Sequence, residues 1–216
     1  MSIPLRPRVL IADDHLLVAE ALKSLLALEF DLVGVVADGR ALLEAAGTLR
    51  PDVIVADITM PQLNGIDALI QLRQDGDQVP VVFLTMHQNA NFARRALEAG
   101  ASGFVLKHSA PAELILAIRA ALEGRTYLSQ QIVEEVMKTM KQGAEKAADP
   151  LGSLTLRQRE VLQLLAEGRL AKEIAYKLEI SARTVEFHKY QMMESLSLHT
   201  NAELIHFAIK HGLVEL

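Results

Sequence analysis

Short apolar runs rich in β-branched residues alternate with helical patterns along the first 124 residues of the chain. We predict strands at residues 8–12, 32–37, 53–56, 80–84 and 103–106. The segments between them carry apolar residues at helical spacing, as at Leu17, Ala21 and Leu25 in the first. Five repeats of strand and helix predict a doubly wound α/β domain with a five-stranded parallel sheet.

The pattern changes after residue 126, where the strand signals cease. A one-sided apolar stripe predicts a helix from Ser129 to Met140, and residues 142–150 have the polar, glycine- and proline-containing composition of a linker. The stripe consists of Ile132, Val133, Val136, Met137 and Met140. Packing of this stripe on its own domain and contact with a partner protein both stay open.

Beyond Gly152 the chain has the pattern of several short helices. Thr155 with Gln158, and Thr200 with Glu203, have the spacing of the capping box, in which two side chains satisfy backbone amides at the start of a helix. We therefore predict a small all-α domain at the carboxyl end. The predicted parts are an α/β domain at 1–126, a linker with a helix at 127–151, and the all-α domain at 152–216.

Composition narrows the class of protein. Half of the 216 residues are hydrophobic, so the chain can form a core, and it has no cysteine for a disulfide or a thiolate metal site. No apolar stretch reaches the roughly 18 residues of a membrane span, and the first residues lack an apolar leader segment. We expect a cytoplasmic protein with no membrane partner. The formal net charge is −5, and residues 151–216 carry equal numbers of basic and acidic side chains, so neither domain is basic.

Polar and charged side chains follow the predicted strands at one end. Asp13 and Asp14 follow the first strand, Asp57 the third, Thr85 the fourth and Lys107 the fifth. Because strand ends of equal polarity share one edge of a parallel sheet, we expect these side chains to converge. Three carboxylates, a hydroxyl and an ammonium suit a divalent cation and a phosphoryl group. Taken singly, Asp14 would serve as a helix N-cap, Asp57 as a turn residue and Lys107 as a surface lysine.

Four segments of this domain resemble the receiver domain of response regulators. They are Val9–His15, Asp57–Gly65, Leu84–Thr85 and Phe104–Lys107, and the resemblance covers residues 8–124. It implies a flavodoxin-like fold, a Mg²⁺ site, and Asp57 as both the phosphoacceptor and a metal ligand.

The resemblance also implies a role for each neighbouring side chain. Asp14 would coordinate the metal directly, Asp13 through water, and Thr59 through its backbone carbonyl. Lys107 and Thr85 would contact oxygens of the phosphoryl group. Because clustered carboxylates repel one another, we expect at least one raised carboxylate pKa in the metal-free site.

A conformational switch is implied by the same resemblance. In receivers the threonine moves toward the phosphoryl group and an aromatic residue on the last strand turns inward behind it; Thr85 and Phe104 occupy these positions. Phe104 would serve equally well as an ordinary core residue. Two residues depart from the family pattern. In many receivers a proline follows the lysine and the peptide bond between them is cis; here His108 follows Lys107, so the isomer of this bond stays open. Met86 stands where the family usually has a small residue, so the dephosphorylation rate is expected to differ.

The second domain is similar to the LuxR-type helix-turn-helix in the stretches Leu154–Leu162, Ala171–Ala175 and Ile180–Val185, over residues 152–214. Ser181 can cap the recognition helix, while Ile180 and Val185 form a hydrophobic staple. Val185, Met192 and Leu196 would face inward. The resemblance assigns base contacts to Glu186, Phe187 and Tyr190, and phosphate contacts to Lys172, Arg183, Thr184 and Lys189.

The two resemblances together identify the chain as a member of the NarL/FixJ-type response regulators. They imply that a sensor histidine kinase phosphorylates Asp57, that the phosphorylated protein forms a homodimer, and that the second domain then binds double-stranded DNA to regulate transcription. The balanced charge of that domain predicts weak DNA binding when it is isolated.

Two other functions stay open. An adaptor that acts only through protein contacts would need no basic DNA-binding surface. An aspartyl-phosphate hydrolase would use the same nucleophile, but that chemistry normally needs a second acid two residues later, where this chain has Thr59.

Overall fold

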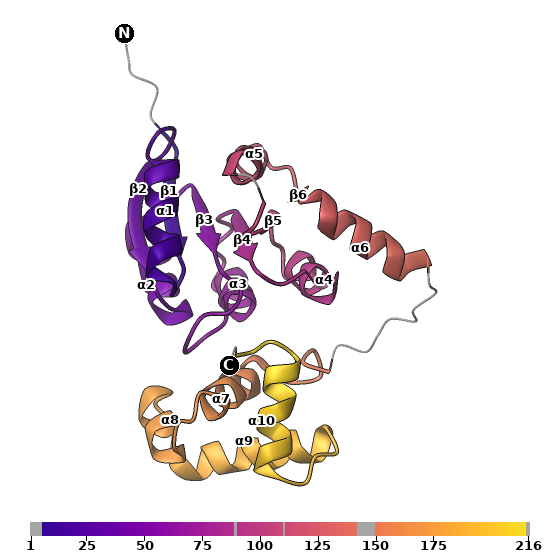
Figure 1. Ribbon diagram of the computed structural model, residues 1–216. Helices are drawn as coiled ribbons and strands as arrows, with labels where there is room; N and C mark the ends of the chain where they lie inside the picture. The colour runs from indigo at the N-terminus through magenta and orange to yellow at the C-terminus, as the bar shows by residue number, and fades with distance from the viewer. Residues whose placement is uncertain (1–5, 89, 110, 142–149, 215–216) are drawn as a thin grey trace. The chain divides into compact units, whose positions relative to one another are not determined.

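The computed structural model describes residues 6–88, 90–109, 111–141 and 150–214 (Figure 1). The chain divides into two compact units. The first contains the elements from β1 to α6, and the second contains α7 to α10. The predicted linker residues 142–149 lie outside the described part of the chain.

A parallel sheet forms the centre of the first unit, with the strand order β2-β1-β3-β4-β5-β6. The strands are β1 (Arg8–Ala12), β2 (Asp31–Val36), β3 (Val53–Ala56), β4 (Val81–Thr85), β5 (Gly103–Leu106) and β6 (Tyr127–Leu128). The α/β class and the first five strands agree with the prediction, whereas the predicted number of strands was one too few. Strand β6 pairs with β5 over only two residues, too short a segment to give a periodic signal in the sequence.

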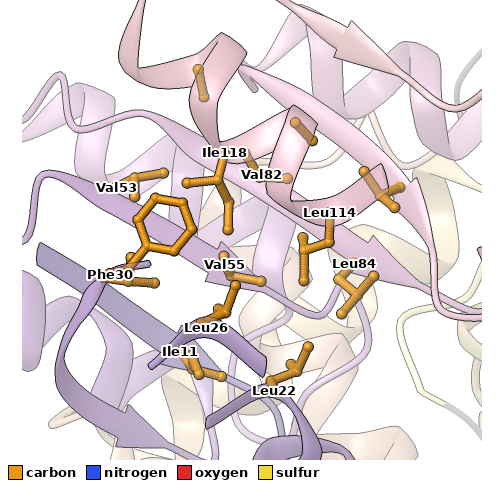
Figure 2. Close-up of a cluster of buried hydrophobic side chains, with 14 residues drawn as sticks. Ile11, Leu22, Leu26, Phe30, Val53, Val55, Val82, Leu84, Leu114 and Ile118 are labelled. Atoms are coloured by element: carbon orange, nitrogen blue, oxygen red, sulfur yellow. The ribbon is translucent and has the colours of Figure 1, made fainter. Parts of the chain in front are cut away.

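Six helices accompany the sheet: α1 (Leu16–Leu26), α2 (Gly39–Leu49), α3 (Gly65–Gln74), α4 (Ala90–Glu98), α5 (Pro111–Leu122) and α6 (Gln130–Lys141). One face of the sheet forms a core with α1 and α5, in which Leu22, Leu26, Leu114 and Ile118 meet alternate residues of the strands (Figure 2). The intervening strand residues, such as Phe83, are also buried, and they point to the opposite face because side chains alternate along a strand.

Helix α6 packs against α4 of its own unit. From the predicted apolar stripe, Ile132 is fully buried, Val133 and Val136 are half-buried, and Met137 remains 56% exposed. Packing on its own domain therefore accounts for the first part of the stripe. The side chain of Met140 lies outside the described part of the molecule.

The second unit consists of α7 (Leu156–Ala166), α8 (Ala171–Lys177), α9 (Ala182–Ser195) and α10 (Asn201–Lys210) around an apolar core. Both predicted capping boxes are present, at Thr155 and at Thr200. Ser181 caps α9 by accepting a hydrogen bond from the amide of Thr184 at 3.0 Å, as predicted. Across the described ranges, none of the helices is both long and apolar enough to span a bilayer.

Candidate functional site

The ends of β1, β3 and β5 bring the predicted charged residues together. Ala12 pairs with Ala56 in the register of β1 and β3, and the amide of Asp57 donates to the carbonyl of Ala12 at 2.8 Å, so Asp13 and Asp57 lie side by side. The amide of Lys107 donates to the carbonyl of Thr85 at 2.8 Å. Residues from distant parts of the chain thus share one edge of the sheet.

The ammonium of Lys107 lies between two buried carboxylates. Its Nζ is 2.6 Å from Oδ2 of Asp57 and 2.8 Å from Oδ2 of Asp13. Oδ1 of Asp57 accepts a hydrogen bond from the amide of Ile58 at 2.6 Å. One cation therefore pairs with two carboxylates, which leaves a local excess of negative charge.

The pKa values of this cluster reflect burial and the ion pairs. Burial raises the pKa of Asp57, and nearby Asp13 raises it further, while the pairing with Lys107 opposes this without cancelling it. Burial acts to lower the pKa of Lys107, but the carboxylates of Asp57 and Asp13 overcome this effect and raise it. The expectation of a raised carboxylate pKa is confirmed for Asp57.

Four residues could supply donor atoms to a metal ion here: Asp13, Asp14, His15 and Asp57 each offer one, and these atoms all lie within 4.8 Å of one another. Asp13 and Asp57 are buried, whereas Asp14 and His15 are exposed. No role for His15 was predicted from the sequence. Thr59 lies two residues after Asp57, in the loop between β3 and α3, and its hydroxyl is 2.7 Å from Nε2 of His87.

Gly65 supports the loop that carries Asp57. A Cβ at Gly65 would lie 2.2 Å from the backbone oxygen of Asp57 and 2.9 Å from Cε1 of Phe83. Asn64 caps helix α3 at this point by accepting a hydrogen bond from the amide of Asp67. Only a glycine lets α3 start this close to the Asp57 backbone. Sequence analysis named Gly65 in the resemblance but did not find this role.

The predicted switch residues are both fully buried. The Thr85 hydroxyl accepts a hydrogen bond from the amide of His87 at 3.2 Å, and Phe104 lies in the core. Met86, next to Thr85, is largely exposed. The ring of His87 stacks on Phe92 of α4, with 4.3 Å between centroids. His87, which sequence analysis missed, thus connects the Thr59 loop, Thr85 and α4.

The peptide bond between Lys107 and His108 is trans. The ammonium of Lys107 reaches both carboxylates in this isomer. The absence of a proline at residue 108 therefore does not prevent Lys107 from entering the site.

The predicted DNA-contacting residues of the second unit lie on α8 and α9. Lys172, Arg183, Phe187 and Tyr190 are exposed, while Thr184, Glu186 and Lys189 are half-buried. Lys189 forms an ion pair with Glu186, and its Nζ lies 5.6 Å from the centre of the Tyr190 ring. Glu186 therefore neutralises the charge of Lys189, which is one of the predicted phosphate contacts.

A cleft at helix α8 brings together cations that were not grouped in the prediction from the sequence. Arg169, just before α8, lines one cleft together with Lys172, Glu173 and Lys177 of the helix. Tyr176, which is 90% exposed, also lines this cleft. Although residues 151–216 have equal numbers of basic and acidic side chains, the cleft has three cations and one carboxylate, so it is locally positive. The charge balance of the unit therefore understates its local basic character.

Comparison with family models divides the chain in the same way. The model for the response regulator receiver domain matches residues 9–119. The model for bacterial regulatory proteins of the luxR family matches residues 152–208.

Similar proteins extend over almost the whole chain. It is 35% identical to the transcriptional regulatory protein MctR of Rhizobium johnstonii, over 96% of this chain and 95% of that protein. It is 34% identical to the oxygen regulatory protein NreC of Staphylococcus aureus, over 96% of this chain and 99% of that protein.

Solved structures of response regulators match either most of the chain or part of it. RcsB from Salmonella enterica serovar Typhimurium, bound to a promoter in the presence of the phosphomimetic BeF₃⁻, has a TM-score of 0.62 and 28% identity, over 94% of this chain and 98% of that one. A LuxR-family response regulator from Aurantimonas has a TM-score of 0.61 and 36% identity, over 63% of this chain and 99% of that one.

Proposed function

Because this chain belongs to the response regulators that join a receiver domain to a LuxR-type DNA-binding domain, we propose that Asp57 accepts a phosphoryl group from a sensor histidine kinase. Its relatives are transcription regulators. The observation that carries the proposal is the position of Lys107, whose ammonium lies 2.6 Å from Asp57 and 2.8 Å from Asp13.

The transfer itself needs a nucleophile and charge compensation. A carboxylate oxygen of Asp57 attacks phosphorus, the bond between phosphorus and the histidine nitrogen of the kinase breaks, and that nitrogen keeps the electron pair. Lys107 then contacts a phosphoryl oxygen as a positive charge, and Thr85 donates its hydroxyl to another. Asp57 is buried, and burial strengthens these interactions because the local dielectric constant is lower than in water.

The donor set fits Mg²⁺, which prefers oxygen ligands and needs few from protein. Asp14, Asp57 and the backbone carbonyl of Thr59 would hold the ion directly, and Asp13 through water. The ion would neutralise charge between the carboxylate and the phosphoryl group. Asp13 and Asp57 share the single ammonium of Lys107, so a second cation would compensate the remaining negative charge.

Incubation of the full chain with acetyl phosphate and Mg²⁺ tests the acceptor. Intact-mass measurement should show one added phosphoryl group in the parent, none in Asp57→Asn, and one in the control Asp75→Asn, which changes an exposed aspartate after α3. An adduct that persists in Asp57→Asn would refute the assignment.

We further propose that phosphorylation favours a homodimer, which binds two half-sites of double-stranded DNA in the cytoplasm. The exposed aromatic residues of α9, Phe187 and Tyr190, would contact base edges, together with Glu186. Lys172, Arg183, Thr184 and Lys189 would contact phosphates. In a dimer, binding of one DNA-binding domain raises the effective concentration of the other at its half-site. This gain offsets the weak DNA affinity that we expect from the balanced charge of each domain.

A mobility-shift titration with and without acetyl phosphate separates this function from the alternatives. Binding that strengthens on phosphorylation supports the regulator. No shift even at low salt favours an adaptor, and continuous turnover of phosphate esters favours a hydrolase. For RcsB, the solved complex with a promoter and a phosphomimetic shows that both ligands can be present at once.

A further inference from the structure

His15 places a nitrogen beside the carboxylates of the first unit. Its Nδ1 is 3.0 Å from Oδ1 of Asp14 and 3.4 Å from Oδ1 of Asp13. The side chain of His15 is 56% exposed, so packing does not force it toward the carboxylates. Its donor atom belongs to the same group, within 4.8 Å, as those of the three aspartates.

The position of His15 in helix α1 does not explain why a histidine stands there. It is the N-cap residue of α1, yet its side chain makes no capping hydrogen bond. Asparagine, aspartate or serine would stabilise that helix start by about 1 kcal/mol relative to a non-capping residue. The imidazole instead faces the acidic cluster, so its interactions there are the ones to explain.

The 3.0 Å separation matches the spacing of neighbouring ligands on one metal ion. With octahedral bonds of about 2.0–2.1 Å, adjacent donor atoms lie about 3 Å apart. A cation bound by Asp14 can therefore also take the lone pair of His15 Nδ1.

We propose that His15 Nδ1 is a metal ligand and gives this site a preference for late first-row divalent ions, such as Co²⁺, over Mg²⁺. The proposal rests on the metal site of the proposed function and adds a nitrogen to its oxygen donors. Imidazole binds Co²⁺ and its heavier neighbours well, whereas Mg²⁺ prefers oxygen and gains little from it. His15 is therefore the residue that sets metal selectivity.

A different role for His15 would be to orient Asp14 through a hydrogen bond, without touching the metal. In that case the loss of His15 would lower the affinities for Mg²⁺ and Co²⁺ to the same extent, because both ions bind Asp14. The ratio of the two affinities therefore distinguishes a ligand from a positioning residue.

Calorimetric titration of the full-length protein with Mg²⁺ and, separately, Co²⁺ tests the proposal. His15→Asn and His15→Ser both keep a residue suited to the N-cap of α1, so the fold should persist, as circular dichroism can verify. His199→Asn, at an exposed histidine before α10, is the matched control. We expect His15→Asn to lower the affinity for Co²⁺ by about tenfold or more and the affinity for Mg²⁺ by less than about twofold.

A direct readout of the nitrogen ligand is pulsed EPR of the Mn²⁺-loaded protein. Coupling to a ¹⁴N nucleus should appear in the parent and in His199→Asn, and disappear in His15→Asn and His15→Ser. If His15→Asn lowers the affinities for both metals equally, or leaves both the affinities and the ¹⁴N coupling unchanged, His15 is not a metal ligand. Either result leaves the Mg²⁺ site in place. If the parent protein binds neither ion, the metal site and the role of His15 fail together.

Discussion

Substitution of Gly65 by alanine should displace the loop of the phosphoacceptor. The added methyl would lie 2.2 Å from the backbone oxygen of Asp57 and 2.9 Å from Cε1 of Phe83, which is fully buried. Ordinary contacts between such atoms are about 3.3 Å or more, so Asp57 or the start of α3 must move by about 1 Å. Overpacking costs about 1–3 kcal/mol, and a backbone obstacle favours the upper part of this range.

Gly47 provides the matched control. It is an exposed residue within α2, and a Cβ there would have no heavy atom within 4 Å. Gly47→Ala should therefore stabilise the protein by about 0.5–1 kcal/mol, because alanine loses less backbone entropy in a helix. The same chemical change is expected to have opposite signs at Gly65 and Gly47.

Calorimetric melting and the rate of phosphorylation by acetyl phosphate measure the two effects. At about 2–4 °C per kcal/mol, Gly65→Ala should lower Tm by about 4–12 °C, and Gly47→Ala should raise it by about 1–4 °C. Phosphorylation should slow in Gly65→Ala alone, since only this variant moves Asp57. A Gly65→Ala protein that melts and is phosphorylated like the parent would refute the steric argument.

Three further predictions follow from the charges and exposed surfaces. Burial raises the pKa of Asp57 above its ordinary 3.8, so ionised Asp57 destabilises the fold at neutral pH. Asp57→Asn should thus raise Tm at pH 7, and the gain should shrink as pH falls through the raised pKa toward 3.8; a lower Tm at pH 7 would contradict this. Lys107→Met leaves two buried carboxylates without their cation, at a cost of about 3–5 kcal/mol, so Mg²⁺ should raise Tm more in this variant than in the parent. In fluorescence anisotropy with DNA, Lys172→Ala should reduce the slope of log K against log salt concentration by about 1, while Tyr190→Ala leaves this slope unchanged. Identical slopes in the two variants would argue against the assignment of Lys172 to a phosphate and Tyr190 to a base.

The convergence of charged residues could be predicted because it depends on few rules. Parallel strands present their carboxyl ends on one edge, so Asp13, Asp57 and Lys107 had to meet once the strands were assigned. The caps at Thr155 and Ser181 were equally predictable, since each depends on residues three positions apart.

Other features depend on packing that no local pattern records. The two residues of β6 are too few for a periodicity, and the contact of Gly65 with Asp57 depends on the angle at which α3 starts. The bond between Thr59 and His87 joins residues that are 28 positions apart. The ion pair of Glu186 with Lys189, by contrast, has the spacing of helix neighbours and was open to prediction from the sequence.

Helix α4 is attached to its unit mainly through small side chains. Its buried residues are Ala90, Ala93 and Ala96, whereas those of α5 include Leu114 and Ile118. A methyl group contributes about 0.8 kcal/mol on burial, and a leucine or isoleucine about 1.5–3 kcal/mol. We therefore expect α4 to slide at a lower free-energy cost than α5. Because its buried contacts are alanines, α4 can shift readily beside Thr85, at the end of β4, and His87, which follows it.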